Sequence, residues 1–252
     1  MSVQLNQPPH VPPLELTGER TLPDVPDENY WFRRHLTVYR WVAERCAGKR
    51  VVDMACGEGY GSALLARTAA EVIGVDANPE AFEHARLRYQ APNLRFERAL
   101  VEEFADGAPY HAIVFLQTIE HVNDPAGLLD RFASLLAPGG VAYVTTPNRL
   151  TLAPPGAERS DNPWHVREYA PEEFEALVRP VFASVEVLGV FHARKLRVHE
   201  LAIRAGWDRI HPAFGLTKRF YRWFVPAISE RDFVLRTGPL GRALDLLAVC
   251  RR

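Results

Sequence analysis

A loop of glycines and acids early in the chain has the residue types needed to bind a nucleoside-type ligand. Asp53, Gly57 and Gly59 lie in the segment DMACGEG, between a short apolar run and a stretch of helical spacing. Glycine lets the backbone pass close to a ligand at the carboxyl end of a parallel strand. Asp76 ends the next apolar run, and a carboxylate there can accept hydrogen bonds from both ribose hydroxyls of an adenosine-type cofactor.

Three interpretations of this loop compete: a dinucleotide site, an S-adenosylmethionine site and a plain turn. A dinucleotide fold needs G-x-G-x-x-G to seat a pyrophosphate on a helix N-terminus, but Ser62 stands at the position of the third glycine. Asp53 would also bring negative charge close to a phosphate. S-adenosylmethionine has no phosphate and carries a sulfonium, so nearby acids are tolerable. The spacing D-x-x-x-G-x-G, together with Asp76, therefore favours S-adenosylmethionine.

His121 is the candidate general base. It stands in the segment QTIEH, just after an apolar run, at the rim where an acceptor would approach the cofactor. In methyl transfer the enzyme aligns the acceptor and excludes water, and an alcohol acceptor must also lose its proton. Histidine titrates near neutral pH, as a base for this step should. The alternative is that His121 caps the following helix or packs against it.

A second polar cluster lies in the segment NPWHVREY (162–169), within a long loop at a frequent lid position. We expect the Trp164 ring to stack on a sugar face, and Arg167 and Glu168 to bond hydroxyl groups. His165 and Glu168 are the further catalytic candidates. The alternative is structural, with both side chains tying the loop to the body of the protein.

Alternating apolar runs and helical segments predict an α/β fold, with a parallel sheet covered by helices on both faces. The expected strands are 50–54, 71–76, 94–99, 111–117, 141–148, 183–191 and 245–252, the last returning antiparallel at the sheet edge. The expected helices are 28–46, 60–70, 79–89, 124–140 and 171–178. The chain divides into an N-terminal arm with a cofactor-covering helix (1–47), a core (48–192), a basic, aromatic helical cap insertion (193–240) and the final strand (241–252).

The ordered motifs VVDMACGEGYG, VIGVDANPEAFEHARLRY, HAIVFLQTIEH and LLAPGGVAYVTTPN resemble those of class I S-adenosylmethionine-dependent methyltransferases. The resemblance implies a Rossmann-like sheet of seven strands, the last one antiparallel. It places ten residues around the cofactor: Asp53, Ala55, Gly57, Gly59, Asp76, Ala77, Asn78, Leu100, Val101 and Gln117. Two of them depart from the family pattern. Ala55 stands where glycine is usual, and Leu100 stands where an acid often meets the adenine amino group.

Two narrower likenesses concern the acceptor. Gln117, Glu120 and His121 resemble the E-x-x-E-H metal pattern of ubiquinone-type O-methyltransferases, which implies a Mg²⁺ site weakened by the loss of one carboxylate. The segments NYWFRRH (29–35) and GVFH (189–192) resemble actinobacterial methyltransferases that cap methylmannose polysaccharides by 1-O-methylation. That likeness implies a sugar O-methyltransferase of polysaccharide biosynthesis, with Tyr30 and Arg34 reaching the cofactor's carboxylate.

Charge is spread unevenly along the 252 residues. The net charge is −1, but 13 basic and 5 acidic residues follow residue 192, against 17 and 26 before it. The basic segment 194–222 could face RNA, an anionic membrane or an anionic acceptor, although a solvated helical cap is the favoured interpretation and no nucleic-acid partner is expected. Three cysteines are too few for a disulfide framework. The sequence also shows neither a signal peptide nor an apolar run long enough to span a membrane, so we expect a cytoplasmic protein; a homodimer is left open.

These patterns predict an S-adenosylmethionine-dependent O-methyltransferase. Its expected acceptor is a sugar, such as a partly methylated mannoside, or a similar small metabolite. One alternative is a natural-product O-methyltransferase for polyketides or phenols, which would have a mostly apolar, metal-free acceptor pocket. The other is a non-catalytic methyltransferase-like protein that binds the cofactor and contacts RNA or lipid.

Overall fold

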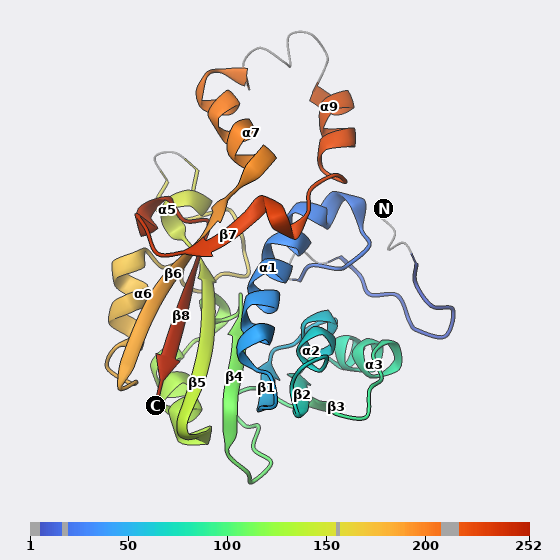
Figure 1. The fold of residues 1–252 in the computed structure, drawn as a ribbon, viewed down its shortest axis with the longest axis vertical. Helices are drawn as coiled ribbons and strands as arrows, with labels where there is room; N and C mark the ends of the chain where they lie inside the picture. The colour runs from blue at the N-terminus through green and yellow to red at the C-terminus, as the bar shows by residue number, and fades with distance from the viewer. Residues whose placement is uncertain (1–5, 17–19, 155–156, 208–216) are drawn as a thin grey trace.

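The computed structural model describes residues 6–16, 20–154, 157–207 and 217–252. Its framework is an eight-stranded sheet in the order β3-β2-β1-β4-β5-β8-β6-β7 (Figure 1). The strands are β1 (Arg50–Met54), β2 (Glu71–Asp76), β3 (Leu94–Arg98), β4 (Tyr110–Leu116), β5 (Leu136–Pro147), β6 (Ser184–His192), β7 (Phe233–Arg236) and β8 (Asp245–Arg251). Neighbours among β1 to β5 pair in parallel. The predicted α/β, Rossmann-like class is confirmed.

Two features of the sheet correct the sequence prediction. The sheet has eight strands rather than seven, because β7 adds an edge strand to β6 from within the segment expected to form the cap. The final strand β8 is antiparallel, as predicted, but it lies between β5 and β6 instead of at the edge. Six of its seven residues are buried, which agrees with its continuous apolar sequence.

Helices cover both faces of the sheet (Figure 1). On one face, α1 and α2 pack through Val42 and Leu65 against the strands, and on the other, α4 and α6 pack through Phe132 and Phe174. The α-helices are α1 (Asn29–Arg45), α2 (Tyr60–Leu65), α3 (Pro79–Arg88), α4 (Pro125–Leu135), α5 (Arg149–Leu152), α6 (Pro171–Val178), α7 (Arg194–Arg204) and α9 (Thr217–Phe224). Short 3₁₀ turns are η1 (Pro26–Glu28), η2 (Ile119–His121), η3 (Glu230–Asp232) and η4 (Leu240–Arg242).

Two helices end earlier than their sequence pattern predicts. The helix expected over 60–70 stops at Leu65, and the helix expected over 124–140 stops at Leu135, where β5 begins at once. The segment LAPGG, expected to stop the helix, is instead the irregular start of β5. Its pairing with β4 shifts register after Leu136, and Gly139 adopts a positive φ of 74°.

Helices α7 and α9 project together from one end of the molecule (Figure 1). We call this pair of helices the arm. Two residues of the predicted basic segment, Arg209 and Phe214, lie outside the described residues. Among the described helices, none is long and apolar enough to cross a membrane. The three cysteines are buried and unpaired.

Candidate active site

A cavity of about 370 Å³ opens where the chain leaves β1, β2 and β4. Ligands of open parallel sheets bind at this carboxyl edge. The predicted cofactor residues that line the cavity are Ala55, Gly57, Asp76, Ala77, Asn78, Leu100, Val101 and Gln117. The other four predicted positions, Tyr30, Arg34, Asp53 and Gly59, do not line it.

Asp76 is held in place by backbone donors at the mouth of this cavity. Its Oδ2 accepts a hydrogen bond from the Gly57 amide at 2.8 Å, and its Oδ1 accepts one from the Asn78 amide at 2.9 Å. Asn78 in turn caps α3, because its side-chain oxygen accepts from the amides of Glu80 and Ala81. The carboxylate therefore has a fixed orientation at the position expected to meet the cofactor's ribose.

Asp53 lies behind the glycine loop and not in the cavity. The side chain is buried and accepts hydrogen bonds from Ser62 Oγ at 2.7 Å and Tyr39 Oη at 3.1 Å. Burial raises the pKa of this carboxyl to about 7. Asp53 thus joins β1 to α1 and α2, and Ser62, which replaces the third glycine of a dinucleotide loop, is one of its partners.

Gly59 packs against α3 and allows the turn of the glycine loop. Its φ of 94° is one that glycine adopts readily, and a Cβ there would come within 2.8 Å of Ala85 Cβ. The residue thus supports the loop without lining the cavity.

Tyr30 and Arg34 point to partners other than the cavity. Arg34 is buried and makes a bidentate ion pair with Asp245, and it donates a further hydrogen bond to the Leu244 carbonyl oxygen at 2.7 Å. Tyr30 Oη is 2.8 Å from His192 Nε2. In this structure the two side chains join α1 to β8 and β6, and that they reach the cofactor's carboxylate stays a prediction. The partner Asp245 is distant in sequence, so no local pattern indicated this pairing.

The N-terminal segment and α1 cover the cavity with residues that sequence reasoning missed: Arg20, Thr21, His35, Tyr39 and Tyr60 from the start of α2. Thr21 Oγ1 lies 3.4 Å from both His35 Nδ1 and Tyr60 Oη. Burial lowers the pKa of His35 to about 4, so this ring is neutral at neutral pH. The apolar helix 28–46 was expected to cover the cofactor, but its pattern does not say which of its polar residues face inward.

His121 stands in η2 and lines the cavity beside Gln117. Its Nδ1 is 2.7 Å from the carbonyl oxygen of Trp164, so the loop that contains residues 162–169 holds the ring in place. Gln117 has a positive φ of 54°, and its Nε2 donates to Thr145 Oγ1 at 2.9 Å. A non-glycine residue in this conformation is a strained position of the kind often found at functional sites.

His165 and Glu168 form a buried pair next to His121. His165 Nδ1 is 2.7 Å from Glu168 Oε1, and the two histidine rings meet edge to face with centroids 5.1 Å apart. Burial alone would raise the pKa of Glu168, but hydrogen bonds from Ser160 and His165 hold it below its usual value. The loop backbone is also tied to η2, because the amide of Val166 donates to the Glu120 carbonyl oxygen at 2.8 Å. His165 and Glu168 therefore tie the loop to the body of the protein, as the structural alternative predicts. The pair also lies close to the cavity, beside His121.

Glu120 completes a group that could hold a metal ion. Ligand atoms of Glu120, His121 and His165 lie within 4.8 Å of one another. Glu120 is buried, its Oε2 has no hydrogen-bond partner, and burial raises its pKa to about 8. A buried carboxyl oxygen without a partner is costly, and a cation that replaced the proton would satisfy it. Gln117, which was expected in the metal set, is not part of this group.

The donor set suits some metals and not others. Mg²⁺ prefers an octahedron of oxygen ligands, whereas two histidine nitrogens and one carboxylate suit first-row transition metals. Both histidines also hydrogen-bond an oxygen through Nδ1, as metal-ligating histidines commonly do. His165 Nε2 is 3.0 Å from the Asn162 amide nitrogen, which a metal would displace. The residues present therefore do not fit Mg²⁺, but they fit a transition metal.

A methyltransferase-domain family profile matches residues 30–201 of this chain. The chain is 43% identical over 249 residues to a probable S-adenosylmethionine-dependent methyltransferase of Mycolicibacterium smegmatis, covering 95% of each protein. The chain belongs to the S-adenosylmethionine-dependent methyltransferases. The methyltransferase is also 34% identical to a ubiquinone biosynthesis O-methyltransferase of Albidiferax ferrireducens, over 65% of this chain and 70% of that protein. A solved methyltransferase structure from Thermotoga maritima, 18% identical, shares the fold with a TM-score of 0.60, over 89% of this chain and 94% of that one.

The cofactor of the methyltransferase is accordingly S-adenosylmethionine. This cofactor has no phosphate and needs no phosphate-binding loop, which agrees with Ser62 at the third-glycine position and with the acids around it.

Proposed function

We propose that the methyltransferase transfers its methyl group to a hydroxyl oxygen of a sugar-like small acceptor, with His121 as the general base. The observation that carries the proposal is that His121 lines the cofactor cavity with its Nδ1 2.7 Å from the Trp164 carbonyl oxygen. A carbonyl oxygen only accepts, so Nδ1 bears the proton and Nε2 bears the lone pair of the neutral ring. Nε2 is therefore the atom that takes the acceptor's proton.

The neighbouring residues position the acceptor. Bound S-adenosylmethionine supplies a methyl group on a positively charged sulfonium. Trp164 is half exposed and its carbonyl oxygen contacts His121, and an aromatic face of this kind can stack on the apolar face of a sugar. His165 and Glu168 supply polar groups next to it. The similarity to a ubiquinone biosynthesis O-methyltransferase supports oxygen as the accepting atom.

The test is methyl transfer from labelled S-adenosylmethionine to free and partly methylated mannosides, phenols and RNA. We expect transfer to mannosides, and we expect His121→Gln to lower kcat about 10²- to 10⁴-fold while cofactor affinity stays unchanged. Transfer only to phenols would replace the sugar by a natural-product acceptor. Cofactor binding without transfer to any member of the panel would favour the non-catalytic alternative.

The group formed by Glu120, His121 and His165 supports a second mechanism, in which a divalent transition metal binds the acceptor oxygen. Such an ion would lower the pKa of the acceptor's hydroxyl and orient it. The unpartnered Oε2 of Glu120 is the observation that favours this mechanism. Homodimer formation also stays a prediction, which the mass of the protein in solution would test.

Metal binding can be measured apart from activity. Cobalt(II) titration should give a visible absorption spectrum if the three side chains bind an ion. We expect Glu120→Gln and His165→Gln each to remove that spectrum, and Gln117→Ala to leave it unchanged. If Gln117→Ala and Glu120→Gln remove it while His165→Gln does not, the site is the one the sequence resemblance implied. A wild-type protein without a spectrum leaves His121 as a metal-free base.

A further inference from the structure

The arm is held together by aromatic rings between its two helices. The His199 ring stacks on Phe220 with centroids 5.7 Å apart, and it contacts Phe224 with centroids 4.8 Å apart. Phe220 and Phe224 also stack on each other. The faces of α7 and α9 that point toward each other therefore pack together within the arm.

The outward faces combine large apolar side chains with cations. Val198 and Leu201 on α7 are 66% and 57% exposed, and Trp223 on α9 is 80% exposed, more than any other large apolar side chain in the described residues. The exposed cations around them are Arg194, Arg197, Arg204, Lys218, Arg219 and Arg222. Within the two helices as described, Glu200 is the sole acid, and it pairs with Arg204 and His192. Exposed apolar groups among cations are the pattern of an interfacial helix.

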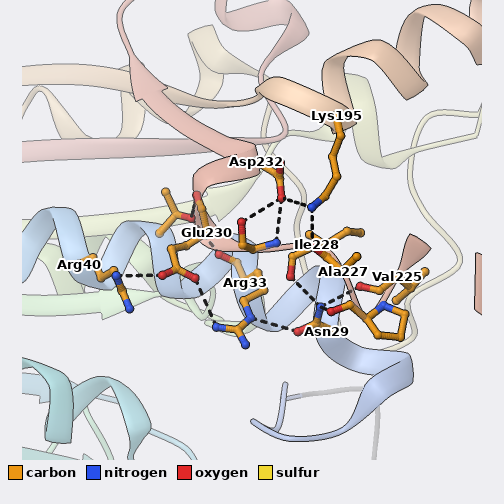
Figure 2. Close-up of polar contacts among 12 residues, drawn as sticks. Asn29, Arg33, Arg40, Lys195, Val225, Ala227, Ile228, Glu230 and Asp232 are labelled. Carbon is orange, nitrogen blue, oxygen red and sulfur yellow. Dashed lines mark hydrogen bonds and ion pairs between the residues drawn. The ribbon is translucent and has the colours of Figure 1, made fainter. Parts of the chain in front are cut away.

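The base of the arm is fixed to α1 by polar contacts (Figure 2). Asn29 Nδ2 donates to the carbonyl oxygens of Val225 at 2.8 Å and Ile228 at 2.9 Å, just beyond α9. At the start of α7, Lys195 pairs with Asp232 at 3.1 Å and donates to the Ala227 carbonyl oxygen. Lys195 is thus a structural cation, unlike the exposed arginines of the outward faces.

A second set of contacts joins the same region to the middle of α1. Glu230 forms ion pairs with Arg33 at 3.3 Å and with Arg40 at 2.9 Å, as Figure 2 shows. The arm is therefore anchored to the helix that also covers the cofactor cavity, and the two keep a fixed relation to each other.

The arm stands at the same edge of the sheet as the active site. β8 is antiparallel to β5 and β6 is antiparallel to β8, so β6 ends at the edge where β1, β2 and β4 end. The arm follows β6 directly (Figure 1). Trp31 and Trp164 are both exposed near this edge: Trp31 follows Tyr30, which contacts His192 at the end of β6, and the Trp164 carbonyl oxygen contacts His121 just after β4.

We infer that the arm docks on an anionic lipid surface and brings the catalytic edge of the methyltransferase to it. Opposite charge attracts the six outward cations to acidic headgroups, while Val198, Leu201 and Trp223 enter the interface. The acidic remainder of the chain is repelled by such a surface, which orients the molecule with the arm foremost. A lipid surface is favoured over RNA because the aliphatic Val198 and Leu201 offer no face on which bases could stack. The inference does not depend on the sugar assignment.

The test is sedimentation of the full chain with vesicles of phosphatidylcholine, with and without phosphatidylglycerol. We expect binding to the phosphatidylglycerol vesicles alone, weakening as salt rises. Arg219→Glu/Arg222→Glu should lower this affinity about tenfold or more, and Trp223→Ser should lower it as well. The matched control is Arg67→Glu/Arg86→Glu, which makes the same change of charge at exposed positions beyond α2 and on α3 and should leave binding unchanged.

Three outcomes would overturn the inference. Equal binding to both vesicle types, or equal weakening by the control variant, would show that the arm does not recognise anionic lipid. Salt-sensitive binding of RNA, with no vesicle binding, would assign the cations to nucleic acid. A dimer that Trp223→Ser dissociates would assign the patch to a second copy of the chain. Retained S-adenosylhomocysteine binding checks that each variant is folded.

Discussion

At the scale of single residues, two aspartates at the ends of the neighbouring strands β1 and β2 have different roles. Asp76 faces the cofactor cavity and is oriented by two backbone amides, whereas Asp53 is buried behind the loop and joins three elements. Both acids were predicted to bind the cofactor, because both stand near the end of a strand in the expected motif. Only the packing of α1 and α2 distinguishes them, through Tyr39 and Ser62.

Replacement of these two acids should separate binding from stability. Asp76→Asn loses one acceptor oxygen, and we expect S-adenosylmethionine affinity to fall about 10- to 100-fold, as for a lost charge-assisted hydrogen bond. Asp53→Asn, the matched control, should change the thermal midpoint more than the affinity. Calorimetric titration and thermal unfolding measure the two effects. Equal loss of affinity in both variants would contradict the distinction.

Glu120 should make the stability of the protein depend on pH. Its pKa rises from a usual value of 4.5 to about 8 in the folded state, so between these values the folded state holds a proton that the unfolded chain has lost. Stability therefore falls as pH rises from about 5 to 8. We expect Glu120→Gln to make this decline shallower in metal-free protein, measured as thermal midpoint against pH. The same slope in wild type and variant would argue against a protonated Glu120.

At the scale of elements, the sequence predicted the parts that rest on local pattern. The apolar strands, the glycine loop and the helix starts at Pro79, Pro125 and Pro171 lie where the sequence places them. The central place of β8 and the extra strand β7 depend on pairing between distant segments, which no local pattern shows. The partner of Arg34 and the covering residues Thr21 and His35 were missed for the same reason.

The contact between α1 and α2 depends on a single glycine. A Cβ on Gly61 would lie 2.1 Å from the Tyr39 ring, which is itself packed and bonded to Asp53. We expect Gly61→Ala to lower the free energy of unfolding by about 1–3 kcal/mol through overpacking, measured by urea denaturation. Gly241→Ala is the control: the nearest atom to its Cβ is Leu150 Cδ1 at 3.7 Å, so its effect should stay within about 0.5 kcal/mol. Similar losses in both would show that the helix contact is loose.

At the scale of the whole molecule, a buried ion pair joins the first long helix to the last strand. Arg34 on α1 and Asp245 on β8 are almost fully buried. Removing one partner leaves an unpaired buried charge, so we expect Arg34→Met to cost about 3–5 kcal/mol of unfolding free energy. Arg33→Met, which breaks the partly exposed pair with Glu230 and a hydrogen bond to Asn29 Oδ1, should cost about 1 kcal/mol or less.

A double variant tests whether the pair itself is responsible. Arg34→Met/Asp245→Leu removes both charges, and we expect it to be more stable than Arg34→Met alone. Chemical denaturation of the three proteins gives the coupling free energy. Additive losses would mean that Arg34 stabilises the fold by packing and not through its charge.

The central position of β8 has a consequence for how the chain is made. β5 and β6 leave the ribosome long before β8, yet they cannot become neighbours until β8 is inserted between them. Until then the nascent sheet has two open edges and an uncovered apolar gap, a state prone to aggregate. A stop codon shortly before residue 245 would therefore leave the sequence of the cofactor loop intact. Without β8, however, the complete sheet could not form. Such products should be early targets for chaperones and proteases.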